Sequence, residues 1–127
     1  MKLQIILSIL TGLTLSACST TPQNPNTPVV LEQHKNIQAE PATKHNLARL
    51  IKQRDNCVIE FTGNFSAGKA TEHWIFKGAQ LISAFSNVDA DVENKQTVFD
   101  IASAERQANF ASLAKNFKQR NLDQCKN

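Results

Sequence analysis

A period-two alternation that begins at Cys57 is the feature that most constrains how this chain can fold. One set of alternate residues is apolar, and the other set is mixed in polarity. The apolar set contains Cys57, Ile59 and Phe61, and the mixed set contains Val58, Glu60 and Thr62. Alternation of this kind is typical of a β-strand that buries one face. The segment therefore predicts a strand whose cysteine faces the core.

Three further segments extend this strand into a sheet. Residues 71–76 have the composition of a second strand. The Lys-Gly pair at residues 77–78 indicates a tight turn into a third strand, residues 80–88. Residues 97–101 are a fourth, short candidate. Because these segments follow one another with short connections, we expect an antiparallel meander.

Two segments have the spacing of helices instead. Thr43 is a suitable N-cap for a helix that ends near Arg54. Its apolar residues recur at intervals of three and four, as in one stripe of a helix: they are Leu47, Leu50 and Ile51. A second helix is expected after the last strand candidate, with Asp100 or Ser103 as its cap. Its apolar stripe contains Phe110, Leu113 and Phe117.

The order of these elements predicts an α+β fold. We expect a small antiparallel sheet of three to four strands, with an N-terminal and a C-terminal helix packed on one face, as a single domain over residues 43–127. All four prolines precede it, between residues 22 and 41. Residues 18–42 are therefore expected to form a flexible linker, with a reach on the order of 70 Å if it is polyproline-like. The apolar residues 29–31 within it are either a docking segment or a chance run.

The N-terminus carries a motif that identifies a class of exported protein. Lys2 is followed by an apolar run that ends in a short string of small residues and a cysteine: Leu15, Ser16, Ala17 and Cys18. This string resembles the lipobox of bacterial lipoproteins. The resemblance implies that residues 1–17 are a signal peptide, that Cys18 becomes the lipidated N-terminus, and that this covalent lipid is the sole non-protein group. The apolar run is too short to span a bilayer as a helix.

The same resemblance implies a location and an oxidation state. In lipoproteins an Asp after the cysteine favours the inner membrane, so Ser19 favours an outer-membrane protein that faces the periplasm. The alternative is an ordinary secretory signal that ends in Cys. The periplasm is oxidising, and with Cys18 lipidated two cysteines remain. Cys57 and Cys125 are therefore expected to form a disulfide, the alternative being two unpaired buried thiols.

Nucleotide and nucleic-acid binding are both disfavoured. The net charge of +3 includes Lys2, which leaves with the signal peptide, so the mature chain is mildly basic. Gly63, Gly68 and Lys69 match part of a phosphate-binding P-loop. Ala70 stands where that loop requires Ser or Thr, and a strand is predicted where the loop requires a helix. We expect no nucleotide site.

Metal binding has little support. Asp89, Asp91 and Glu93 faintly resemble the alternating oxygen ligands of a calcium loop, but Asn94 occupies the position that requires Gly. The segment is either a solvated acidic loop or an opportunistic site for a divalent cation. No two histidines have metal-ligand spacing; they are His34, His45 and His73.

The remaining candidates form a binding patch rather than an active site. His73 and Trp74 on the second predicted strand, with Arg49 and Lys52 on the first predicted helix, are the residues we assign to it, although Trp74 has a place in the core as its alternative. No serine accompanies His73 in a motif of nucleophilic catalysis. We therefore predict a noncatalytic, lipid-anchored periplasmic adaptor or assembly accessory that binds a cell-envelope or secretion-system protein. The alternative is a small-ligand binding module or an inhibitor of a periplasmic lytic enzyme.

Overall fold

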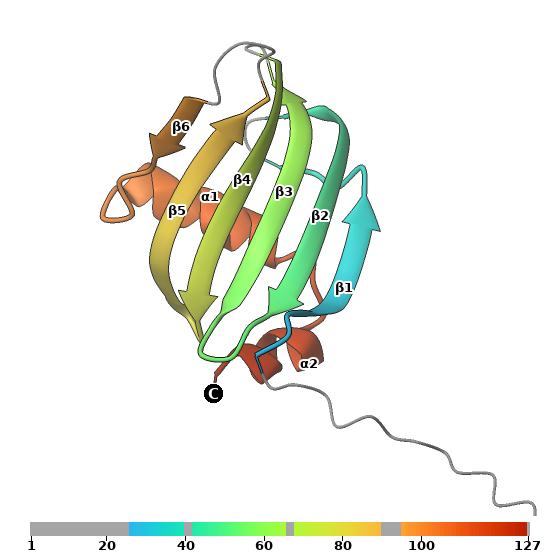
Figure 1. Ribbon diagram of the computed structural model, residues 1–127, viewed down its shortest axis with the longest axis vertical. Coiled ribbons are helices and arrows are strands. Elements are labelled where there is room, and N and C mark those ends of the chain that lie inside the picture. Colours follow the sequence, from blue (N-terminus) through green and yellow to red (C-terminus); the bar gives the residue numbers. More distant parts are fainter. Residues whose placement is uncertain (1–25, 40–41, 66–67, 90–94, 127) are drawn as a thin grey trace, which may run out of the picture.

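Six antiparallel strands form one sheet in the computed structural model, which describes residues 26–39, 42–65, 68–89 and 95–126. Each strand pairs with its neighbours in sequence, in the order β1-β2-β3-β4-β5-β6 (Figure 1). The strands are β1 (Val29–Lys35), β2 (Lys44–Lys52), β3 (Cys57–Phe65), β4 (Gly68–Lys77), β5 (Gln80–Val88) and β6 (Lys95–Val98). The sheet is thus a continuous meander.

One face of this sheet is covered by helix α1 (Ala104–Ala114) (Figure 1). Ser103 caps the helix, because its side chain accepts a hydrogen bond from the backbone N–H of Arg106. The ring of Phe110 lies 6.4 Å from that of Trp74 and 5.1 Å from that of Phe76, measured between centroids. Aromatic packing between α1 and the inward residues of β4 therefore forms the centre of the core.

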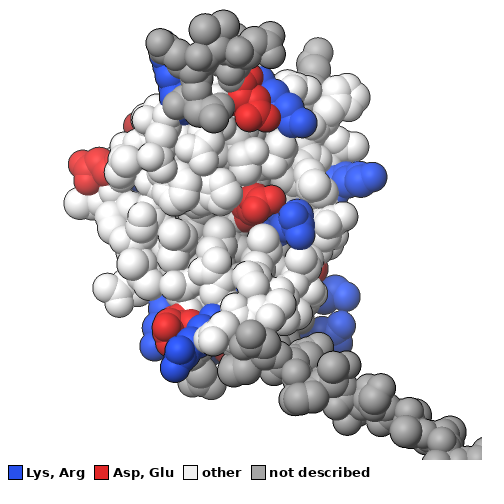
Figure 2. Space-filling view, viewed as in Figure 1, with Lys and Arg blue, Asp and Glu red and all other residues white. Residues whose placement is uncertain are grey.

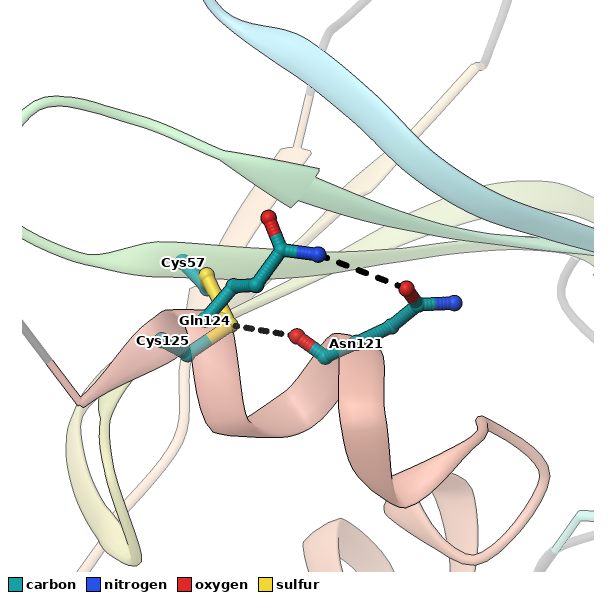
Figure 3. The surroundings of a disulfide bond; sticks show 4 residues. All are labelled: Cys57, Asn121, Gln124 and Cys125. Carbon is teal, nitrogen blue, oxygen red and sulfur yellow. Dashed lines mark hydrogen bonds between the residues drawn. A yellow bond between two sulfur atoms is a disulfide. The ribbon is translucent and has the colours of Figure 1, made fainter.

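The C-terminal segment closes one end of the sheet. Helix α2 (Gln119–Leu122) and the 3₁₀ turn η1 (Asp123–Cys125) lead to a disulfide between Cys125 and Cys57, with sulfur atoms 2.08 Å apart (Figure 3). This is the pair predicted from the sequence. The N–H of Gly78, in the β4–β5 turn, also donates to the carbonyl of Cys125 over 2.8 Å. Two strand ends are thus tied to the C-terminal segment.

Helix α2 is also held to strand β1 through a buried carboxylate. The Glu32 side chain, 8% exposed, accepts hydrogen bonds from the Lys118 backbone N–H at 2.9 Å and from Asn121 Nδ2 at 2.7 Å, and it also pairs with His34. Burial alone would raise the pKa of Glu32. The hydrogen bonds from Asn121, His34 and Lys118, with the positive charge of His34, nevertheless hold this pKa below its ordinary value. We call this arrangement the Glu32 clasp.

The predicted N-terminal helix does not exist, so the predicted fold class is wrong. Residues 44–52 form strand β2, in which Leu50 faces the core while Leu47 and Ile51 face the other side. Apolar residues on both faces of one strand produce the three-and-four spacing that suggested a helix. His45 has a positive φ of 55°, a conformation that an α-helix excludes, beside a shift in register.

The strand number was also underestimated. Residues 29–35, within the range predicted to be a linker, form β1, and with β2 and β6 this gives six strands instead of three to four. Residues 36–39 follow β1 and are held by the side chain of Asn46. The Asn46 amide accepts a hydrogen bond from the Ile37 N–H at 2.8 Å and donates one to the Ile37 carbonyl at 2.9 Å. The folded part of the chain therefore begins well before residue 43.

The central hairpins follow the sequence patterns closely. β3 begins at Cys57 and β5 spans Gln80–Val88, as predicted. The inward residues of β3 are almost fully buried: they are Cys57, Ile59 and Phe61. The expected C-terminal helix is present as α1, with Phe110, Leu113 and the following Phe117 buried.

Replacing both Cys57 and Cys125 by Ser should lower the free energy of unfolding by about 2–5 kcal/mol, because the bridge closes a long loop in the unfolded chain. The two residues are 68 positions apart in the sequence. Urea unfolding followed by the fluorescence of Trp74, the single tryptophan, measures the change. A C18S variant provides the control, and an unchanged midpoint in the double variant under non-reducing conditions would contradict the expectation.

Replacing Glu32 by Gln should remove stability that depends on pH. A carboxyl whose folded pKa lies below its unfolded value of about 4.5 stabilises the fold above that pH, and the contribution is lost as the pH falls through the folded pKa. We expect E32Q to cost on the order of 1–3 kcal/mol at pH 7 and progressively less below pH ~4.5. Urea unfolding at several pH values tests this. The exposed, uncharged Gln33 on the same strand supplies the control, since Q33A should retain the wild-type pH profile.

Candidate interaction surfaces

The residues predicted to form one binding patch lie on two sides of the sheet. Trp74 is 1% exposed and packs in the core, 5.3 Å from the Phe99 ring. Lys52 is at the end of β2 in register with the core residue Cys57. Arg49 and His73 share the opposite face. The structure therefore brings together two of the four residues.

The face opposite α1, called the open sheet face below, consists of three rows that cross the strands. Residues paired across an antiparallel sheet point to the same side, so each row follows from the register. The middle row is Gln33, Arg49, Glu60, His73, Phe85 and Val98. The second row is Val30, Ile51, Val58, Ile75 and Ser83. The third row is Lys35, Leu47, Thr62, Thr71, Asn87 and Gln96.

Charge is scarce on this face. Figure 2 shows a broad uncharged area with one opposite-charge pair near its middle and most other charges at the rim. Arg49 and Glu60 pair across β2 and β3 at 3.4 Å, and both side chains are partly exposed. An exposed pair of this kind contributes little stability. Its value is positional, because it is the one ion pair on this face among the described residues.

The middle row combines an imidazole with apolar side chains. The His73 ring stacks on Phe85 with centroids 4.8 Å apart and planes inclined by 22°. Val98, next in the row, is 73% exposed. His73 can donate or accept a hydrogen bond while Phe85 and Val98 offer apolar area. This combination suits a protein partner with mixed chemistry.

The second row is an apolar strip. Ile51, Val58 and Ile75 are adjacent across β2, β3 and β4, and the strip reaches the exposed Val30 on β1. Ile82, which is bypassed by the register shift between β4 and β5, is also exposed. A strip of large aliphatic side chains on the open face of a sheet is characteristic of a protein contact rather than of a small-molecule pocket.

A groove on the other side of the molecule has different chemistry. It lies between α1, α2 and the β4–β5 turn and has a volume of about 720 Å³. Its apolar lining includes Phe76, Phe110 and Leu122. The exposed Lys115 and Lys126 contribute positive charge. Such a groove can hold a small amphipathic anion.

A buried carboxylate lies on the helix-covered side of β4. Burial raises the pKa of Glu72, while the Trp74 indole N–H, which donates to it over 3.4 Å, and the positive charge of Arg106 oppose this shift. The Arg106 guanidinium lies 3.9 Å from the centroid of the Phe99 ring. From the sequence Glu72 was expected beside His73 on an exposed sheet face, whereas its alternation with Trp74 and Phe76 on β4 places it on the inward side.

The other chemical motifs are accounted for as follows. β4, and not a helix, follows Gly68, so Gly63 and Gly68 belong to the β3–β4 hairpin. Residues 90–94 of the acidic loop lie outside the described residues. Asp89 is described, and its N–H donates to the Lys69 carbonyl over 2.9 Å. In the described ranges, no three His, Cys, Asp or Glu residues are grouped so as to hold a metal ion.

Comparisons with known proteins identified no relative of this chain. No protein-family model, curated protein or solved structure matches this chain. Within the part of the chain that the structure describes, no helix has both the length and the hydropathy needed to cross a membrane.

Replacing Glu72 by Gln should stabilise the protein at neutral pH, the opposite of the change at Glu32. Because the folded pKa of Glu72 lies above its unfolded value of about 4.5, the unfolded chain loses its proton first, and the free energy of unfolding falls as the pH rises through this interval. E72Q should abolish this fall and gain on the order of 1 kcal/mol at pH 7. Urea unfolding at pH 4 to 8 measures both effects, and a less stable variant with the wild-type pH profile would refute the expectation.

Proposed function

We propose that this chain is a noncatalytic, lipid-anchored periplasmic adaptor that binds another protein of the cell envelope through its open sheet face. The observation that carries the proposal is the apolar strip of the open sheet face, in which half-buried Ile51 and Ile75 flank the buried Val58, beside the His73–Phe85 stack and the exposed Val98. Apolar and aromatic side chains with few charges are enriched at the centre of protein interfaces. The Arg49–Glu60 pair supplies a polar point that can orient the partner.

The anchor part of the proposal depends on Cys18 and the lipobox around it. A lipidated cysteine with more than one acyl chain holds a protein stably on a bilayer. Ten residues, 19–28, separate Cys18 from the start of β1 at Val29. Ten residues reach at most about 35 Å when fully extended. The adaptor would therefore act within about 35 Å of its own membrane. This is about half of the roughly 70 Å expected for a linker over residues 18–42.

Sheet edges offer a second means of contact. β1 and β6 are the edge strands, and every residue of β6 is exposed. An edge strand presents unpaired N–H and C=O groups to which an extended segment of a partner can add. Val98 lies both on β6 and in the middle row of the open sheet face. A partner could thus engage the face and this edge together.

The groove supports a second candidate function, a small-ligand binding module. Its volume of about 720 Å³ falls within the range of ligand sites, about 300–1,000 Å³. Phe76 and Phe110 would contact an apolar part of the ligand, and Lys115 or Lys126 would pair with an anionic group. Isothermal titration calorimetry with a fatty acid tests this candidate, and its result does not depend on the proposal for the open sheet face.

The adaptor proposal predicts directional crosslinking in intact cells. A photoreactive amino acid placed at Thr71 or Val98, both on the open sheet face, should capture the same envelope protein from both positions. The matched control positions are Glu105 and Ala111, which are exposed on α1, and these should not capture it. Capture should fall at least about tenfold when T62R is added, a cost of about 1.4 kcal/mol.

Two outcomes test the lipid anchor and the binding surface separately. C18A should move the protein out of the membrane fraction if the lipid anchor is correct, without altering the fold. Equal capture from the sheet face and from α1 would sink the proposed binding surface, whereas retention of C18A in the membrane fraction would sink the proposed anchor.

A further inference from the structure

The starting point of β1 decides which end of the domain lies nearest to the proposed lipid. β1 begins at Val29, and only ten residues separate it from Cys18. The same end of the sheet holds the β2–β3 turn at residues 53–56, the β4–β5 turn at residues 78–79, and the C-terminal residues 118–126 (Figure 1). We call this the anchor-proximal end. A fully extended tether places it within about 35 Å of the lipid.

The anchor-proximal end carries a surplus of positive charge. Its cationic side chains are Lys52, Arg54, Lys77, Lys118, Arg120 and Lys126. Its exposed carboxylates are Asp55 and Asp123, and the buried carboxylate of Glu32 is a third, so the described residues give six cations against three anions, a surplus of three. All of these side chains except Lys52 and Glu32 are exposed. Figure 2 shows blue side chains gathered around this lower end.

The charges of the C-terminal segment are held in fixed positions relative to the sheet. The Glu32 clasp binds the Lys118 backbone and Asn121, and the disulfide fixes Cys125 to the start of β3. Lys126 forms an ion pair with Asp123 at 3.1 Å, which satisfies one of the two carboxylates within the segment. The cations on α2 and those on the β-turns therefore form one rigid surface.

The other end of the sheet is also basic. Lys35, Lys44, Lys69 and Lys95 lie there with Asp89, so the described residues give four cations against one anion, a surplus of three. The open sheet face between the two ends is nearly uncharged. Among the described residues the two ends are thus similarly basic, and the attachment of the tether is what distinguishes the anchor-proximal end.

We infer that the anchor-proximal end rests on anionic phospholipid headgroups of the membrane that holds the Cys18 lipid. This inference depends on the proposed lipid anchor. Each Lys or Arg near an anionic bilayer contributes about 1 kcal/mol of attraction, and a short tether raises the effective concentration of the surface at the bilayer. Because the strands run from this end to the other, docking stands the sheet upright and turns the open sheet face sideways, toward a neighbouring envelope protein.

The experiment uses the full-length lipidated protein in vesicles of phosphatidylcholine, with or without about a third of phosphatidylglycerol. Acetylation of lysines by a water-soluble reagent, measured by mass spectrometry, reports which end is covered. We expect Lys77, Lys118 and Lys126 to react at least about fivefold more slowly in the anionic vesicles, the equivalent of about 1 kcal/mol. Lys35, Lys69 and Lys95 should react equally in both, and 0.5 M salt should remove the difference.

Two triple variants provide a matched comparison, each removing three positive charges. R54Q/K77Q/K126Q should lose the protection of Lys118, while K35Q/K69Q/K95Q should keep it. Equal acetylation of Lys118 in the two variants would overturn the inference. Failure of the wild-type protein to incorporate into neutral vesicles would overturn the lipid anchor, and the inference with it. Protection found in cell envelopes but absent in anionic vesicles would assign the surface to an acidic protein and overturn the membrane contact alone.

Discussion

The packing of α1 on the aromatic side chains of β4 is the contact on which the rest of the structure depends. Phe110 meets both Trp74 and Phe76, and no other described helix of comparable length is present to share this task. An 11-residue helix is about 16 Å long and about 10 Å wide, whereas six strands span more than about 24 Å. One helix therefore buries only part of one face. The remainder of that face is closed by short segments, including Ile37 and Leu122, and the second face stays open.

The open face explains both what the sequence predicted correctly and what it did not. β3 and the inward residues of β4 alternate cleanly, because one side of each strand meets α1, so the central hairpins were predictable. β2 has apolar residues on both sides, since Leu50 packs in the core while Leu47 and Ile51 lie on the open face, and this mimics a helical stripe. β1 is short and lies between prolines, so its strand character depends on pairing with β2 rather than on its own pattern.

The sequence indicated individual residues of the candidate site but not their arrangement across the strands. Arg49 and His73 were singled out from their chemistry, but their shared face, with Glu60 between them and Phe85 beyond, is a consequence of the register of four strands. The Glu32 clasp shows the same limit, because its donors Lys118 and Asn121 lie 86 and 89 residues away in the sequence. Local patterns report which side of a strand a residue occupies. They do not report which distant residue completes its hydrogen bonds.

The Glu32 clasp and the disulfide both use residues near position 120, and this has a consequence for the proposed export of the chain. A chain that crosses a membrane from its N-terminus delivers β1 to β6 first, while the partners of Glu32 and of Cys57 emerge last. During that interval Glu32 has no donors from α2 and the Cys57 thiol is free to react with other thiols. The clasp and the disulfide can therefore form only after residues 118–125 have crossed. A chain shortened by about ten residues would lose the clasp and the disulfide together, and would present an unfastened edge strand and a reactive thiol by which proteases and thiol oxidases could recognise it.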